Sequence, residues 1–147
     1  MNTTVKVYAP DVELPKYETA GAACMDVKAN ANVTLQPKET KLIPTGLYVA
    51  IPEGYALAIL PRSGVSLKTG FRVVNSPARV DADYRGEVQI IGQNTHGSVE
   101  MHITKGERIA QLELVEVNRI VWETVNSIED LGTTDRGAGG FGHTGAN

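Results

Sequence analysis

The densest group of side chains that can do chemistry lies in the stretch Asn75–Glu87. Asp81 is a carboxylate that can take a proton from water as a general base. Asn75 offers both a donor and an acceptor, as recognition of a nucleobase edge requires, and Tyr84 offers a flat ring and a hydroxyl. Taken alone, the stretch is either a site for base recognition and proton transfer or an ordinary solvated loop.

A second group, Arg62-Ser63-Gly64, suits an anion. It follows a strand-like run that ends at Pro61, at the start of a short helical segment, where free backbone N–H groups and the helix dipole favour negative charge. Arg62 supplies a charged fork, Ser63 a donor and Gly64 a close approach of the backbone. The alternative is a simple helical turn capped by Ser63.

Two polar residues lie among apolar neighbours and therefore need partners. Asp26 follows a run of small residues, so its carboxylate pairs with a cation, either Arg62 or Arg85, or anchors a hydrated metal. Gln111 falls on the face of Ile109 in a predicted strand. If it is buried, its amide needs a partner, which is either a ligand or a neighbouring backbone group.

The last stretch, residues 133–147, is rich in Gly and nearly free of apolar residues. It contains a match to the dinucleotide fingerprint that ends at Gly142, but that motif needs a preceding strand and a following helix, so we reject it. Arg136 and the backbone donors suit an anion, and Phe141 can stack on a base. The stretch is either a frayed tail or an arm that becomes ordered over a ligand.

The elements that must position these residues are short strands. Turn signals recur about every ten residues, which is typical of a β-sandwich or barrel. Two of the runs, 71–74 and 88–91, flank the Asn75–Glu87 stretch as a hairpin, and only 63–70 is expected to be helical. The remaining strands are expected at 5–8, 33–35, 40–43, 47–51, 55–60, 87–92, 98–103, 108–117 and 120–125.

Composition narrows the class of protein further. The length of 147 residues favours one domain, and the net charge of −3 argues against a nucleic-acid partner. The single cysteine, Cys24, favours a reducing compartment. We expect it to be a small buried hydrophobe. No apolar run reaches the roughly 18 residues of a membrane span, and no signal peptide is seen. We expect a cytoplasmic protein, with nuclear or organellar location left open.

Taken in order, five segments resemble the five motifs of the trimeric dUTPase family: 19–29, 61–64, 81–86, 106–111 and 136–142. The resemblance implies an all-β, jelly-roll-like β-barrel that forms a homotrimer, with a barrel domain over 1–132 and a flexible arm over 133–147. It also implies hydrolysis of dUTP to dUMP and pyrophosphate. Each active site would draw the first, second and fourth segments from one chain, the hairpin from another and the arm from a third.

The resemblance also implies residue roles. Asp81 is similar to the general base that activates water, and Tyr84 to the residue that excludes a ribose 2′-hydroxyl. Asn75 and the hairpin backbone at Val80 would read uracil. Mg²⁺ would be held by the substrate phosphates and water, with Asp26 at most in its outer shell. The remaining substrate contacts implied are Arg62, Ser63, Gly64 and Gln111 on the barrel, and Arg136, Phe141, Gly142, His143 and Thr144 on the arm.

Several positions depart from the family pattern. Ala78 and Arg79 stand where a Gly and a small or apolar residue are common, Met25 where an aromatic or apolar residue is common, and His143 where Ser is frequent. Three rival functions remain to be weighed. A deoxycytidine triphosphate deaminase of the same fold would need a glutamate base, a regulatory nucleotide binder would not need the catalytic groups, and a β-sandwich interaction module would leave the order of the five segments unexplained.

Overall fold

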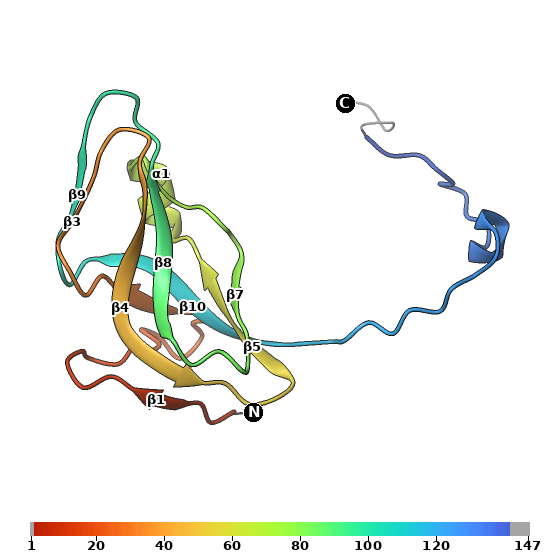
Figure 1. Cartoon of the computed structure of the whole chain (residues 1–147), viewed down its shortest axis with the longest axis horizontal. Coiled ribbons are helices and arrows are strands. Elements are labelled where there is room, and N and C mark those ends of the chain that lie inside the picture. The colour runs from red at the N-terminus through yellow and green to blue at the C-terminus, as the bar shows by residue number, and fades with distance from the viewer. Residues whose placement is uncertain (1, 142–147) are drawn as a thin grey trace.

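The computed structural model describes residues 2–141, and nearly all of its regular structure is β (Figure 1). One helix, α1 (Ser63–Lys68), and a 3₁₀ turn, η1 (Ile128–Leu131), interrupt the strands. No helix in this part of the chain has the length and apolar character needed to cross a membrane. The strands are β1 (Lys6–Tyr8), β2 (Met25–Lys28), β3 (Val33–Leu35), β4 (Thr40–Ala50), β5 (Tyr55–Leu60), β6 (Phe71–Val73), β7 (Ala78–Val80), β8 (Glu87–Asn94), β9 (Met101–Ile103) and β10 (Arg108–Glu116).

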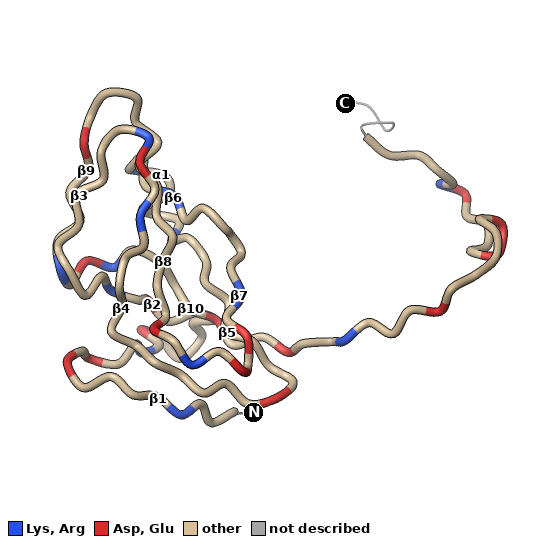
Figure 2. Tube along the Cα trace, viewed as in Figure 1, with Lys and Arg blue, Asp and Glu red and all other residues tan. Residues whose placement is uncertain are grey.

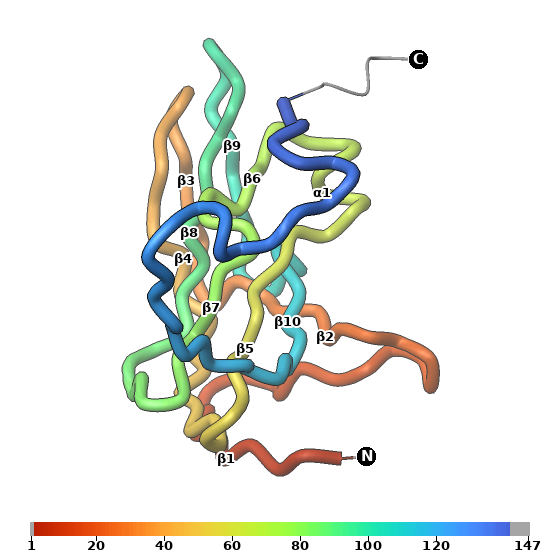
Figure 3. Tube along the Cα trace, turned by 90° about the vertical axis from the view of Figure 1, so that its right-hand side faces the viewer, coloured from red at the N-terminus to blue at the C-terminus, as the bar shows by residue number. Residues whose placement is uncertain are grey.

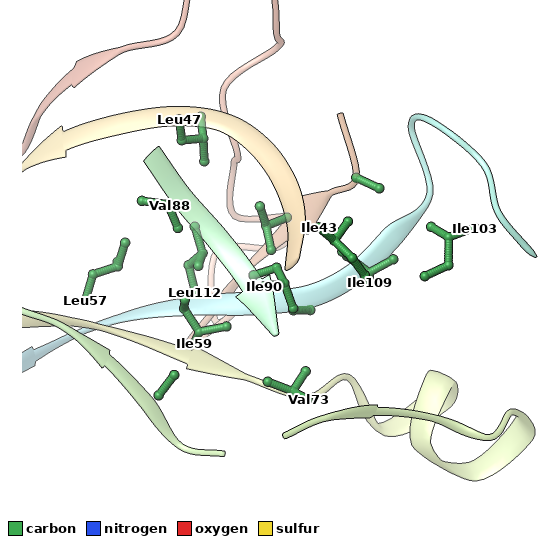
Figure 4. Packing of buried hydrophobic residues seen from close by; sticks show 14 of the residues in the cluster. Ile43, Leu47, Leu57, Ile59, Val73, Val88, Ile90, Ile103, Ile109 and Leu112 are labelled. Atoms are coloured by element: carbon green, nitrogen blue, oxygen red, sulfur yellow. The ribbon is translucent and has the colours of Figure 1, made fainter. Parts of the chain in front are cut away.

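The strands form two four-stranded antiparallel sheets, β1-β4-β8-β6 and β2-β10-β5-β7, and a two-stranded ribbon of β3 and β9. β8 shows why the sheets pack face to face. Its side chains alternate between half-buried and buried, as a strand with one core-facing side requires. Figure 4 shows its Val88 and Ile90 facing Leu112 of β10, so the core lies between the two sheets.

One strand replaces two predicted ones. β4 runs unbroken from Thr40 to Ala50, whereas the sequence predicts separate strands at 40–43 and 47–51 with a break at Pro44-Thr45-Gly46. The pairing with β8 shifts register between Pro44 and Leu47. The chain therefore absorbs the proline and glycine in a bulge and continues the strand, which is a common use of such residues.

The hairpin around residues 75–87 is also more elaborate than predicted. β6 does pair with β8, as expected, and the backbone N–H of Val74 donates to the Ile91 carbonyl at 2.9 Å. Within the expected loop, however, β7 crosses over and pairs with β5 in the opposite sheet. The loop thus joins both sheets at one end of the barrel.

Two other predictions about local structure were wrong. Ser63 does not cap α1: Arg62 occupies the N-cap position, and no side chain caps the helix. Gln111 does not share the face of Ile109, because the pairing of β10 with β2 shifts register between Arg108 and Ala110. That irregularity places both Ile109 and Ala110 in the core and leaves Gln111 only half-buried.

Beyond β10 the chain leaves the barrel (Figures 1 and 3). The strand predicted at 120–125 is absent, since this segment has no neighbouring strand to pair with. Trp122 in this segment is 84% exposed. Its apolar neighbours are also exposed: Ile120, Val121, Val125, Ile128 and Leu131.

Candidate active site

The first group of site residues gathers where β2, β5 and β10 lie side by side. Gln111 on β10 is opposite Asp26 on one side and Leu60 on the other. The Arg62 Nε donates to Asp26 Oδ1 at 2.7 Å, and Gln111 Nε2 donates to the Pro61 carbonyl at 2.8 Å. The predicted cation for Asp26 is therefore Arg62 rather than Arg85, and the partner of Gln111 is a backbone group.

This group, which we call the Asp26 corner (Asp26, Arg62, Ser63, Gly64 and Gln111), is held in place from several sides. A second arginine, Arg108, contacts Asp26 Oδ2 at 3.5 Å, although the sequence analysis did not single it out. Arg62 also donates from Nη1 to the Arg108 carbonyl at 3.2 Å. Ser63 and Gly64, at the start of α1, are exposed, so their hydroxyl and amide groups face solvent beside two arginines.

The second group lies in the hairpin. Asn75, Val80, Asp81 and Tyr84 all line one cavity of about 350 Å³ between β7 and β8. Asp81 is exposed and directly follows β7. The structure therefore brings the predicted general base together with the residues predicted to recognise the nucleobase. In residues 81–87 the charged positions are Asp81, Asp83, Arg85 and Glu87, so this loop is mainly acidic (Figure 2).

Two hairpin residues at unusual positions, Ala78 and Arg79, lie in different surroundings. Ala78 is buried at 7% exposure and pairs with Ile59, so its methyl group packs into the core. Arg79 is exposed, and its guanidinium contacts only the carbonyl of Ala78, at 3.4 Å, within residues 2–141. The structure gives no physical account of the charge at Arg79.

Asp81 and the Asp26 corner lie at opposite ends of β5. Val80 pairs with Leu57 near the beginning of β5, so Asp81 lies beside that end. Ser63 follows the other end of the strand. Gln111 of the corner pairs with Leu60, so about four residues of β5 separate it from Asp81, which at a rise of about 3.3 Å per residue is about 13 Å. A single chain therefore does not bring Asp81 to the Asp26 corner.

The arm forms the third group. Arg136 Nε donates to the Gly139 carbonyl at 2.7 Å, a contact within the arm itself. The Phe141 ring is fully exposed, and Figure 1 shows this part of the chain far from the barrel. Gly142, His143 and Thr144 lie outside the described residues.

Comparison with known proteins identifies the family. The dUTPase family model matches residues 10–145. The chain belongs to the dUTPase family. A deoxyuridine 5'-triphosphate nucleotidohydrolase from Desulfotalea psychrophila is 50% identical over 136 residues, which cover 91% of this chain and 88% of that protein.

Solved dUTPase structures share the fold. A mutant dUTPase of Staphylococcus bacteriophage 80alpha with dUpNHpp has a TM-score of 0.86 at 28% identity and covers 98% of this chain and 99% of that one. A mutant dUTPase from phage phi11 of S. aureus, whose structure concerns a structural Mg(II) ion, has a TM-score of 0.79 at 25% identity, with coverage of 86% and 99%. The predicted all-β, jelly-roll-like barrel of the dUTPases is thereby confirmed.

Two features of this dUTPase chain bear on its chemistry. Cys24 is only half-buried, whereas the sequence predicts a buried residue; partial burial, followed by the negative charges of Glu113 and Asp26, raises the pKa of its thiol. Among residues 2–141, no three His, Cys, Asp or Glu side chains gather as a metal site would need.

Proposed function

We propose that this chain hydrolyses dUTP to dUMP and pyrophosphate. The observation that carries the proposal is the hairpin cavity, which joins Asp81, Tyr84, Asn75 and Val80 in a chain of the dUTPase family. Around this cavity the carboxylate can accept a proton, the amide can form hydrogen bonds with a nucleobase edge, and the aromatic ring can pack against the deoxyribose. The relative from Desulfotalea psychrophila carries the name of the same activity.

The proposed active unit is a homotrimer with shared sites. The distance along β5 supports it, because the base and the phosphate-binding donors of one chain serve different sites. The exposed apolar side chains between Ile120 and Leu131 also support it, since such a series is unusual on a free surface and typical of a contact with another chain. We propose a barrel domain over 1–132 and an arm over 133–147 that reaches a neighbouring copy.

In the proposed mechanism, Asp81 takes a proton from water as the water oxygen forms a bond to the α-phosphorus. The bond from the α-phosphorus to the bridging oxygen breaks, and pyrophosphate leaves with that electron pair. Tyr84 lies under the deoxyribose, while Asn75 and the Val80 backbone read uracil. The donors to the phosphates are Arg62, Ser63, Gly64 and Gln111 of the Asp26 corner and Arg136, His143 and Thr144 of the arm, with Phe141 and Gly142 closing over the base.

Mg²⁺ fits this chain as an ion bound through the substrate. Asp26 is already engaged by Arg62 and Arg108, so we propose that it acts only in an outer shell. An ion held by three phosphates and water needs no compact set of protein ligands. When bound, Mg²⁺ would withdraw negative charge from the phosphates.

One assay tests the proposal: release of pyrophosphate from dUTP, dTTP, dCTP and UTP, with and without Mg²⁺. We expect dUTP to be strongly preferred and the reaction to need Mg²⁺. Deamination of dCTP would instead support the deaminase of the same fold. Tight binding of dUTP without turnover would support a regulatory binder, and either result would overturn the proposal.

A further inference from the structure

The loop of residues 81–87 is braced mainly by bonds within itself. The Tyr84 backbone N–H donates to the Asp81 carbonyl at 3.2 Å, and the Tyr84 hydroxyl donates to the Glu87 carbonyl at 3.0 Å. Arg85 Nη1 donates to the carbonyls of Ala82, at 2.7 Å, and Tyr84, at 2.8 Å. These bonds keep the shape of the loop but do not attach it to the barrel.

Glu87, the first residue of β8, pairs with Tyr48 of β4 and adds a side-chain bond to the barrel. Glu87 Oε1 accepts a hydrogen bond from the Gly46 backbone N–H at 2.8 Å. In the described part of the chain, this is the only side-chain hydrogen bond between residues 81–87 and another element. Glu87 therefore holds the Tyr84 hydroxyl through its carbonyl and the barrel through its carboxylate.

The bulge in β4 makes this anchor point rigid. The Leu47 N–H donates to the Thr45 hydroxyl at 3.3 Å, while the Gly46 N–H donates to the Glu87 side chain. Gly46 has a φ of +74°, and a Cβ there would lie 2.8 Å from the side chains of Asn30 and Val12. Because a backbone N–H in such a place needs a partner, the bulge determines where the Glu87 carboxylate must lie.

The ring of Tyr84 is confined from its other side by Gly86. A Cβ on Gly86 would clash with the Tyr84 hydroxyl, so the ring rests directly on the glycine backbone. The hydroxyl is thus trapped between Gly86 and the carbonyl of Glu87. A shift of Glu87 would move the ring with it.

We propose that Glu87 is a positioning residue that sets selectivity against ribonucleotides. By binding the Gly46 backbone, Glu87 fixes the ring of Tyr84 in the position that admits a deoxyribose and excludes a ribose 2′-hydroxyl. The inference rests on the proposed function and adds to it a residue that lines the hairpin cavity and acts through Tyr84.

The first test compares kcat/KM for dUTP and UTP in Glu87→Ala and the wild type. The ratio of the two values should fall about five- to tenfold, the effect of one lost hydrogen bond of ordinary net strength. Glu87→Gln should restore the ratio, because its amide oxygen can accept from Gly46 as the carboxylate does. An unchanged ratio in a folded Glu87→Ala variant would overturn the proposal.

Glu39→Ala is the matched control. Glu39 Oε2 accepts from the Gln36 backbone N–H at 2.7 Å, the same kind of bond next to the opposite end of β4. Its loss should leave the dUTP to UTP ratio unchanged. An equal loss of selectivity in Glu39→Ala would show that Glu87 acts only through general stability.

A second test examines whether Glu87 acts through Tyr84. In a Tyr84→Phe background, which lacks the hydroxyl, Glu87→Ala should cause little further loss of selectivity. Independent losses in the two backgrounds would contradict the proposal. If Glu87→Ala fails to fold, Glu87→Gln and Glu87→Asp carry the comparison, since Asp keeps the charge but is too short to reach Gly46. Absence of dUTP hydrolysis in the wild type would instead refute the proposed function itself.

Discussion

The Asp26 corner and the arm carry similar chemical groups, arginine, glycine and hydroxyl donors, but they are held very differently. In the corner, Asp26 is bound by two arginines from different elements, and Gln111 is bound to the chain just before α1. In the arm, the Arg136 side chain hydrogen-bonds, among residues 2–141, to the carbonyl of Gly139, three residues away. The corner is held by contacts within the chain, whereas we propose that the arm becomes ordered over substrate or on another chain, at a cost in entropy.

Because of this difference, we expect substitutions in the two regions to affect the stability and the activity of the protein differently. Groups on the barrel should affect folding, chemistry or both when they are changed. Groups on the arm should affect only events that involve substrate. Four changes test that expectation.

Replacement of Asp81, the proposed general base, should have the largest effect on the rate and little effect on substrate binding. Asp81→Asn should lower kcat by about 10²–10⁴, the usual share of general-base catalysis, with binding of a non-hydrolysable dUTP analogue largely kept. Steady-state kinetics and calorimetry check this. The neighbouring exposed Asp83→Asn is the control and should turn over normally. Near-normal turnover in Asp81→Asn would refute the role of Asp81.

Removal of the arm should leave the barrel intact. A chain that ends at Asp135 should fold and form trimers, yet lose about 10²–10³ in kcat/KM, because it lacks a charge-assisted contact to phosphate and a stacking contact to the base. Size-exclusion chromatography with light scattering checks assembly, and the pyrophosphate assay checks activity. Failure to assemble would mean that the arm is structural as well.

Loss of the charge in the corner should affect stability. Asp26→Asn should lower the free energy of unfolding by about 1–2 kcal/mol, since a half-buried hydrogen bond between charged groups is weakened. Activity should also fall because Arg62 loses its support. Denaturant unfolding measures the change. Glu13→Gln, which removes an exposed pair with Lys28, is the control and should have no measurable effect.

Loss of the arm's aromatic ring should leave stability unchanged. Phe141→Ala should weaken substrate binding by about 1–3 kcal/mol through lost base stacking, while the melting temperature stays that of the wild type. Phe141→Trp, which keeps an aromatic face, should bind nearly normally. A lower melting temperature in Phe141→Ala would show that the arm packs on the barrel without substrate.

Local patterns in the sequence were sufficient to predict much of the barrel. The alternation of Val88 and Ile90 indicates a strand with one buried face, and β8 has that form. The need of Asp26 for a cation follows from the high cost of an unpaired carboxylate among apolar residues, while the choice of Arg62 over Arg85 came from the structure. The order of the five segments was enough to indicate the family. These features depend on neighbours in the chain or on a general electrostatic need, which a sequence records directly.

Other features were decided only by tertiary structure. Pro44-Thr45-Gly46 predicts a break, but the neighbouring strand β8 supplies hydrogen-bond partners that turn the break into a bulge. Residues 120–125 have a strand-like pattern and form no strand, because a strand needs a partner and none is adjacent. The chemical groups that this protein carries can be read from its amino-acid sequence alone. Only the packing of β7 on β5 decided that Asp81 lies far from the Asp26 corner of its own chain, since strand pairing joins residues distant in sequence and no local pattern encodes that distance.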